Sequence, residues 1–168
     1  MRKTISALMI GLLTVGDSES AIAQGASADA ACVPGRWEGR GQFLGIPSTV
    51  VSEWSVLVGG RWYVQRMNRS ADNGDPRGRF EAVGLYAIDS TGAVRGQWFD
   101  SRGVTFPLVG TFSACRLTID WGAPAGGERG RSTYQISGDS TMRMTDSVST
   151  PAGMRGFGAA QLSRKSSR

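Results

Sequence analysis

The sequence of 168 residues contains no histidine and only two cysteines. Histidine is the side chain whose unperturbed pKa lies nearest neutrality, so its absence excludes Ser-His-Asp and Cys-His catalysis and a histidine-ligated haem. A zinc site also lacks its usual ligands, since there is no histidine and no Cys-x-x-Cys pair. We therefore expect neither a metal nor a cofactor.

Lysine is nearly as scarce, because Lys165 is the only lysine beyond residue 23. The net charge of +5 thus rests on arginines, which are scattered singly except in the group at 164–168. A nucleic-acid-binding chain would show a basic patch or stripe with a fitting motif. Neither is visible, so we expect no nucleic-acid partner. The arginines indicate solubility, or an acidic ligand or lipid surface as the anionic partner.

The sequence has no long hydrophobic run, and its most apolar stretch is a short run near the N-terminus. Two basic residues precede this run at residues 5–15, and the small residues Ala21 and Ala23 follow it after a polar stretch. This order is typical of a cleavable secretory signal, and the run is shorter than the roughly 20 residues that span a bilayer as a helix. We expect cleavage after Ala23, with Ala28 or Ala30 as later alternatives.

Both cysteines, Cys32 and Cys115, lie beyond the expected signal peptide. In an oxidising compartment such a pair is most simply a disulfide, with two buried free thiols as the alternative. Because it would close a long loop, the bridge would stabilise the fold by roughly 4–5 kcal/mol in the chain-entropy model. Lipid attachment at Cys32 is disfavoured, because this cysteine lies far from the apolar run.

The chain beyond residue 23, about 145 residues, has the size of one domain. The 24 glycines of the full sequence are mostly spread along this part, and short runs rich in Val, Trp, Tyr, Phe and Thr alternate with turn residues. This rhythm predicts about ten strands and no convincing helix between them. The expected organisation is a signal peptide at 1–23, a flexible leader at 24–34, a β-barrel domain at 35–163 and a basic tail at 164–168.

Many short strands at regular spacing are typical of a sandwich or an up-and-down barrel, and closure removes exposed edges. Apolar and polar residues alternate along the expected strands at 79–88, 93–101 and 140–148. The alternation favours a soluble barrel with its apolar face inward over an outer-membrane barrel with that face outward. We predict an all-β fold, a single antiparallel up-and-down β-barrel of about 8–10 strands.

The stretch at 104–109 departs from this pattern, because Pro107 lacks the amide hydrogen that a central strand donates. We expect it to be an edge or irregular strand, followed by one continuous strand at 111–121. The region at 71–78 contains no apolar residue larger than alanine and is expected to form a loop.

The first expected strand carries a short motif, Pro-Gly-Arg-Trp-Glu-Gly-Arg-Gly at 34–41. It resembles the G-x-W opening of the lipocalin and fatty-acid-binding (calycin) barrels. It also resembles nitrobindin-like barrels and a family of secreted bacterial lipocalin-like proteins, to whose turns the stretches at 84–92 and 98–103 are similar. The resemblance implies a calycin-type barrel in which Trp37 closes one end.

Two departures limit what the resemblance implies for a ligand. A nitrobindin-like barrel would hold haem through a histidine, and this sequence has none. Fatty-acid-binding barrels grip a carboxylate through an Arg-x-Tyr motif, whereas Arg131 and Tyr134 are separated by two residues.

A ligand cavity inside a barrel needs apolar walls and a few polar groups. Candidates for the walls lie on expected inward faces, where the alternative role is core filling: Trp54, Tyr86, Trp98, Tyr134, Met142 and Met144. Arg66 is the candidate polar group, because an inward Arg66 beside Trp62 and Val64 would meet an acidic head group. The register of this strand is ambiguous, and a solvated Arg66 is the favoured alternative.

The favoured function is an exported, soluble barrel, periplasmic or secreted, that binds a small hydrophobic or acidic amphipathic ligand in its lumen. One alternative is an interaction or inhibitor protein whose N-terminal arm, residues 24–31, plugs an enzyme. Another, less favoured, is a lipocalin-like isomerase or cyclase that uses tyrosine and buried carboxylates such as Glu53 and Asp100. A structural envelope role is the remaining one. We expect a monomer or dimer that is not an integral membrane protein.

Overall fold

The computed structural model describes residues 28–122 and 127–166; the expected signal peptide at 1–23 lies outside the described residues. Within these ranges the chain forms ten strands and three short 3-10 helices. The strands are β1 (Gly35–Phe43), β2 (Ile46–Val56), β3 (Trp62–Ala71), β4 (Phe80–Ile88), β5 (Ala93–Asp100), β6 (Thr105–Ser113), β7 (Arg116–Gly122), β8 (Arg129–Ser137), β9 (Thr141–Thr150) and β10 (Gly153–Lys165). The 3-10 helices are η1 (Ala28–Cys32), η2 (Val58–Gly60) and η3 (Pro76–Gly78). No helix in the described part of the chain has the length and apolar character needed to cross a membrane.

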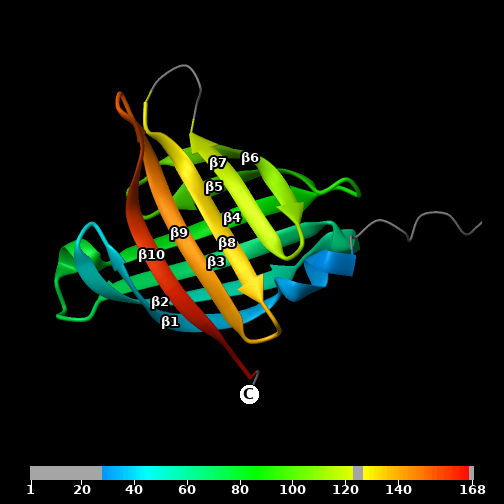
Figure 1. Cartoon of the computed structure of the whole chain (residues 1–168), viewed down its shortest axis with the longest axis horizontal. Coiled ribbons are helices and arrows are strands. Elements are labelled where there is room, and N and C mark those ends of the chain that lie inside the picture. Colours follow the sequence, from blue (N-terminus) through cyan, green and yellow to red (C-terminus); the bar gives the residue numbers. More distant parts are fainter. Residues whose placement is uncertain (1–27, 123–126, 167–168) are drawn as a thin grey trace, which may run out of the picture.

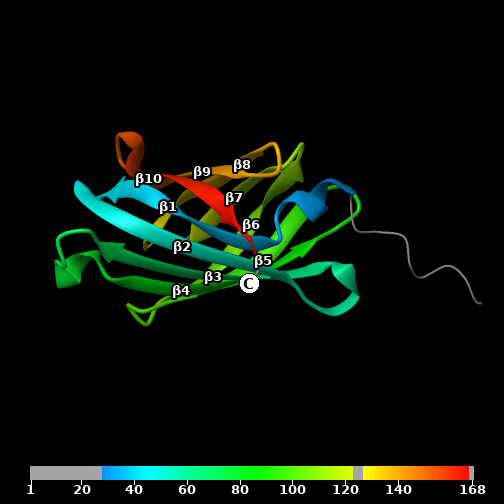
Figure 2. The same ribbon diagram turned by 90° about the horizontal axis from the view of Figure 1, so that it is seen from below.

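The strands form one closed antiparallel barrel in which each strand pairs with its neighbours in sequence and β1 pairs with β10 (Figures 1 and 2). This arrangement confirms the predicted all-β, up-and-down barrel. The closing seam pairs Trp37 with Arg164 and Phe43 with Gly158. Because every described strand has two neighbours, the sheet has no open edge to pair with another chain.

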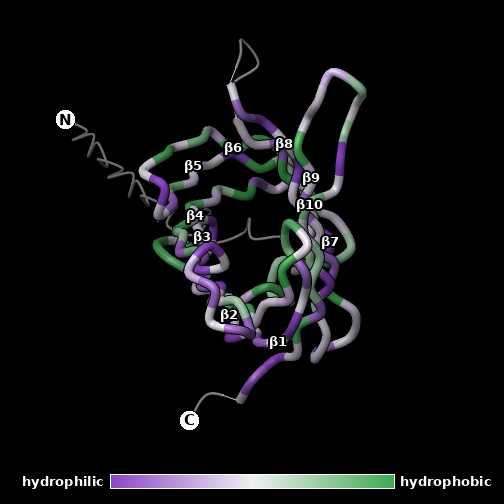
Figure 3. The backbone as a smooth tube through the Cα atoms, turned by 90° about the vertical axis from the view of Figure 1, so that its left-hand side faces the viewer, coloured by the Kyte–Doolittle hydropathy of each residue, from purple (hydrophilic) through white to green (hydrophobic). Residues whose placement is uncertain are grey.

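One face of each strand points into the barrel, as the alternation predicts. In β4 and β5 the register sets Tyr86 opposite Gly96 and Gly84 opposite Trp98, so both aromatic rings lie on the inner face. Figure 3 shows the ring of strands, with hydrophobic and hydrophilic residues following one another along the tube. The expected inward methionines of β9 are fully buried, since Met142 is 0% and Met144 1% exposed.

The segment before β1 closes one end of the barrel. Ala30 of η1 and the following Val33 are buried in the core, and the Trp37 indole Nε1 donates a hydrogen bond to the Val33 carbonyl oxygen at 3.0 Å. Trp37 itself is fully buried. Within the expected flexible leader at 24–34, residues 28–32 form η1, and the side chains of Ala30 and Val33 complete the core at this end.

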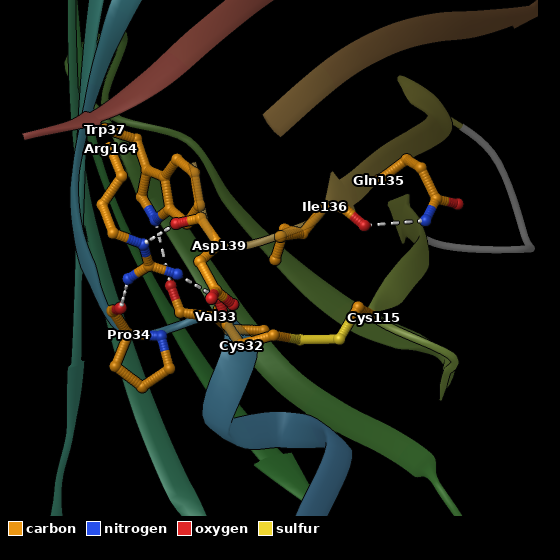
Figure 4. Close-up of a disulfide and its surroundings, with 9 residues drawn as sticks. All are labelled: Cys32, Val33, Pro34, Trp37, Cys115, Gln135, Ile136, Asp139 and Arg164. Atoms are coloured by element: carbon orange, nitrogen blue, oxygen red, sulfur yellow. Dashed lines mark hydrogen bonds between the residues drawn. A yellow bond between two sulfur atoms is a disulfide. The ribbon is translucent and has the colours of Figure 1, made fainter. Parts of the chain in front are cut away.

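Arg164 ties the last strand to this closed end. Its guanidinium donates hydrogen bonds of 2.6 Å to the carbonyl oxygens of Cys32 and Asp139, and a further one to the carbonyl oxygen of Pro34 (Figure 4). The predicted basic tail at 164–168 thus starts too early, since β10 runs to Lys165 and Arg164 belongs to the closed end.

The disulfide between Cys32 and Cys115 is present, as the sequence predicts. It joins η1 to the turn between β6 and β7 across a sequence separation of 83 residues, with the two Cα atoms 6.1 Å apart (Figure 4). The bond therefore fixes the closing segment to the strands on the far side of the barrel from β1.

The strand boundaries around β6 and β7 differ from the prediction. β6 is a regular strand that runs through Gly110 to Ser113, and the chain turns at Ala114 and Cys115, whose φ angles are 48° and 56°. The expected continuous strand at 111–121 was wrong. Two-residue hairpin turns are usually predicted from Asn-Gly or similar pairs, and the Ala-Cys pair at this turn gives no such signal. Pro107 is tolerated because β6 pairs with β7 only from Leu108 onward, which leaves the proline a partner on the β5 side alone.

Candidate ligand-binding site

A cavity of about 340 Å3 lies inside the barrel and opens at the end opposite η1. Its outer lining comes from the turn after β1 and from the β3–β4 and β5–β6 connections. Arg77 and Arg79 belong to this lining, and their side chains are 82% and 77% exposed. The cavity therefore communicates with solvent at this end, which we call the mouth.

Among the described residues, eight aromatic ones line the cavity. Phe80 stacks on Trp98 with ring centroids 6.5 Å apart, and Trp121 packs against Phe106 at 5.4 Å and against Phe157 at 6.4 Å. Such contacts hold large apolar surfaces in fixed positions. The aromatic lining consists of Phe43, Phe80, Tyr86, Trp98, Phe106, Trp121, Tyr134 and Phe157.

The floor of the cavity is a buried hydrogen-bond network around Gln65. Tyr86 donates to Gln65 Oε1 at 2.6 Å, and Gln65 Nε2 donates to Ser52 Oγ at 3.0 Å and to the Tyr134 hydroxyl oxygen at 3.3 Å. Burial raises the pKa of Tyr86 and of Tyr134 well above the ordinary value. Both phenols therefore keep their protons and act as neutral hydrogen-bonding groups.

Trp54 lies beneath this floor. Its ring is 5.0 Å from that of Tyr86 and 5.4 Å from that of Tyr134, measured between centroids. Its indole Nε1 is buried and has no hydrogen-bond partner in the described part of the chain. Trp54 thus supports the two tyrosines that line the cavity and does not line it itself.

A buried carboxylate, Asp146 of β9, faces the cavity. Its Oδ1 accepts a hydrogen bond of 2.6 Å from the Ser132 hydroxyl, whose oxygen in turn accepts one of 3.2 Å from Trp121 Nε1. Burial raises the pKa of Asp146 to about 6, although the Ser132 hydrogen bond and the charge of Arg69 work in the opposite direction. This carboxylate therefore changes its charge in the mildly acidic range.

Arg69 of β3 is a partly buried cation of the cavity lining. Its Cζ lies 4.7 Å from the centroid of the Phe43 ring and 5.2 Å from that of Phe80, and its Nε donates to the Gly78 carbonyl oxygen at 3.3 Å. Burial lowers the pKa of this guanidinium, but an arginine remains charged. The charges of Arg69 and Asp146 act on each other without a direct ion pair between these two described side chains.

Further arginines surround the mouth, most of them paired with carboxylates. Arg102 contacts Asp100 at 2.8 Å and Glu128 at 3.0 Å. Arg77 and Arg79 pair with the neighbouring Asp75 and Glu81. Arg155 also lines the cavity and has no ion pair within the described ranges. The mouth is therefore surrounded by positive charge that is only partly neutralised.

Three of the predicted wall residues, Tyr86, Trp98 and Tyr134, line the cavity, and so does Met144. The candidate inward position of Arg66 is not observed, and the favoured alternative, a solvated Arg66, is. The β2–β3 register sets Gln65 opposite the inward Trp54, which turns Arg66 to the outer face, where it is exposed opposite Glu53. The outer face of β3 carries Trp62 and Val64 and its inner face carries Tyr63 and Met67, so hydrophobicity alone leaves the register of this strand ambiguous.

Arg69 and Asp146 were not among the predicted site residues. A signal for them was present in the alternation, since Arg69 follows the inward Met67 by two residues and Asp146 follows Met144 by two. Residues two apart in a strand share a face. Charged residues at inward positions interrupt the apolar pattern, and for that reason they mark the polar part of the site.

Neither carboxylate suggested for acid–base chemistry is free inside the cavity. Glu53 lies on the outer face in an ion pair with Arg36. The Asp100 side chain is fully buried but is held by Arg102 and by a hydrogen bond of 3.3 Å from Trp98 Nε1. Burial would raise the pKa of Asp100, but the hydrogen bonds from Arg102 lower it overall. Asp146 is instead the buried carboxylate that lines the cavity together with the two tyrosines.

Comparison with known proteins adds little about chemistry. No protein-family model matches the chain, and no curated protein is similar to it in sequence. Among solved structures the chain is similar to a de novo designed fluorescence-activating β-barrel, with a TM-score of 0.47 and 16% identity over 83% of this chain and all of that one. In the described residues no group of three or more His, Cys, Asp or Glu side chains gathers as a metal site would.

Proposed function

We propose that the protein binds a small amphipathic ligand in the open half of its barrel. The apolar part of the ligand lies among the aromatic rings, and its polar head group lies beside Arg69. The observation that carries this proposal is Arg69 itself, a cation held between Phe43 and Phe80 inside a cavity of about 340 Å3. A cavity of this volume lies within the range of roughly 300–1,000 Å3 typical of ligand pockets.

The energetics of a buried charge favour a polar ligand group near Arg69. A half-buried guanidinium that lacks a direct ion pair has lost part of its hydration without full compensation. A carboxylate, sulfonate or phosphate placed beside it would restore that compensation through charge-assisted hydrogen bonds. The aromatic wall meanwhile gains from covering apolar ligand surface.

The closed half of the barrel supports this placement, because its own side chains fill it. Trp37, Leu117, Met142 and Leu162 are each at most 1% exposed. Together with the Gln65 network they limit a ligand to the part of the lumen nearest the mouth.

Export to the periplasm or the cell exterior is part of the proposal. The N-terminal pattern of basic, apolar and small residues supports it, and so does the Cys32–Cys115 disulfide, since such bonds persist in oxidising compartments. The calycin-like G-x-W opening and the closing role of Trp37 also fit a ligand-carrying barrel. The inhibitor alternative is weaker, because residues 28–31 of its supposed arm belong to η1 in the closed end.

The test is a fluorescence titration with N-phenyl-1-naphthylamine, a neutral probe, and 8-anilino-1-naphthalenesulfonate, its anionic relative. Two neighbouring residues of β6 provide a matched pair of variants. Leu108 is buried and lines the cavity, whereas Val109 is 61% exposed on the outer face. We expect Leu108→Trp to abolish binding of both probes and Val109→Trp to leave it unchanged. Equal binding by the two variants, or no binding by the unaltered protein, would overturn the proposal.

A further inference from the structure

Asp146 occupies an unusual place for a carboxylate, inside the wall of an apolar cavity. It is 8% exposed and lies between Ser132 on β8 and Gly158 on β10. Ser132 donates to its Oδ1, and no described residue donates a hydrogen bond to its Oδ2. One oxygen of this carboxylate therefore remains available to a ligand.

The groups that face Asp146 come from several strands. Arg69 of β3 is the cation that acts on it, and the charge of Asp146 in turn raises the pKa of Tyr134 on β8 and of Tyr86 on β4. Arg155 of β10 lines the same cavity, and Glu128 and Arg102 pair with each other at the mouth. Asp146 is thus a buried anion whose charge acts on Arg69. An anionic ligand beside Arg69 would also lie near this negative charge.

The consequence follows from electrostatics in a poorly hydrated space. An anion that approaches Arg69 while Asp146 is ionised also meets the repulsion of the Asp146 charge, which water screens weakly there. When Asp146 carries a proton the repulsion disappears, and its hydroxyl becomes a hydrogen-bond donor to the ligand.

We propose that the cavity takes up an anionic head group together with a proton on Asp146, so that its affinity for organic anions rises as the pH falls. This inference rests on the proposed function and names its ligand class, an apolar molecule with one acidic group. Linkage is reciprocal, so the bound anion also favours protonation of Asp146. The buried position of Asp146, which raises its pKa to about 6, sets the transition in the mildly acidic range.

The two naphthalene probes distinguish this inference from the proposed function, because they share a ring system and differ in the sulfonate. The sulfonate stays ionised between pH 5 and pH 7.5, so a pH effect on its binding belongs to the protein. We expect the anionic probe to bind at least about tenfold more tightly at pH 5 than at pH 7.5. The neutral probe should bind equally at both values.

Asp146→Asn is the matched variant, since it keeps the size and shape of the side chain and removes the titrating charge. It should bind the anionic probe tightly at both pH values. Arg69→Gln should weaken binding of the anionic probe at both pH values and leave binding of the neutral probe unchanged. A pH dependence that persists in Asp146→Asn would overturn the inference, because other groups would then cause it.

A second measurement needs no variant. Calorimetric titration at pH 6 in two buffers of different ionisation enthalpy reports the protons taken up on binding. We expect uptake of about half a proton with the anionic probe and none with the neutral probe. If both probes bind without pH dependence or proton uptake, this inference fails and the proposed function stands. If neither probe binds, the proposed function itself fails.

Discussion

The guanidinium of Arg164 lies over the indole ring of Trp37, with its Cζ 4.1 Å from the ring centroid. The contact joins the last strand to the first at the seam where the barrel closes, because Trp37 and Arg164 are also register partners. The same guanidinium donates to the carbonyl oxygens of Cys32 and Asp139, so one side chain connects η1, β1, β10 and the β8–β9 turn.

Replacing Arg164 should destabilise the barrel more than the same replacement at the neighbouring Lys165. Arg164→Met keeps much of the apolar stem but removes the hydrogen bonds and the cation over Trp37. We expect a loss of about 3 kcal/mol in the free energy of unfolding. Urea denaturation measures it, with the exposed Lys165→Met as the control that should stay within about 0.5 kcal/mol of the unaltered protein. Equal effects of the two variants would contradict the role given to Arg164.

Removing the disulfide should lower stability without changing the cavity. The Cys32–Cys115 bond closes a long loop with a sequence separation of 83 residues, and it lies at the end of the barrel away from the mouth. The double variant Cys32→Ser, Cys115→Ser should lose about 4 kcal/mol in the chain-entropy model. Thermal unfolding measures the loss, and binding of the neutral naphthalene probe well below the transition should be unaffected. An unchanged Tm would show that the bond contributes no stability.

The Gln65 network should contribute to stability through Tyr86. In Tyr86→Phe, Gln65 Oε1 loses its 2.6 Å donor within a buried floor, which leaves an acceptor incompletely satisfied. We expect a loss of about 1–3 kcal/mol in the free energy of unfolding. Tyr63→Phe is the matched control, because the hydroxyl of Tyr63 makes a long 3.4 Å contact with the Gly60 carbonyl oxygen. If Tyr63→Phe were the more destabilising change, the assignment of this network would be wrong.

Asp146 should give the stability of the unliganded protein an unusual dependence on pH. Its pKa in the folded protein is raised to about 6 from an ordinary value of 3.8. A raised carboxyl pKa contributes stability that is present below the ordinary value and is lost as the pH rises through the folded value. We expect stability to fall by about 2 kcal/mol from pH 4.5 to pH 7.5.

Urea denaturation across this range tests the expectation, with Asp146→Asn as the variant in which the decrease disappears. Asp89 has a lowered pKa because of its hydrogen bonds with Thr91 and Ala93, so its contribution to stability is lost only at still lower pH. A decrease of equal size in Asp146→Asn would assign the effect to other groups.

The sequence predicted the barrel because period-2 alternation is strong in the strands that carry most of the core. In β4, β5 and β9 the large apolar side chains lie mostly at inward positions, so Tyr86, Trp98 and Met144 were placed on the correct face. In β3 apolar residues lie on both faces, Trp62 and Val64 outside and Tyr63 and Met67 inside, so hydrophobicity left the register ambiguous. The pairing of β3 with β2 fixes which of its residues face inward, and hydrophobicity alone does not encode that pairing.

The polar part of the site could not be recognised from residue type alone. Arg69 and Asp146 are ordinary surface residues by composition, and only the register that turns them inward places them in the cavity. Likewise, Ala114 and Cys115 form a turn with positive φ angles although neither is a typical turn residue. Both cases depend on contacts between segments far apart in the sequence.

The pairing of β1 with β10 has a consequence for how the protein reaches its fold. The seam joins the first and last strands of the chain, so a chain that lacks its final strand leaves β1 and β9 with unpaired edges. Completion of the barrel must therefore wait for the whole polypeptide, and the most distant contacts in the sequence form in the step that closes the ring. Because this single long-range closure must follow the formation of the local hairpins, it is expected to slow the final step of folding, and until closure is reached the exposed edges are open to association with other chains.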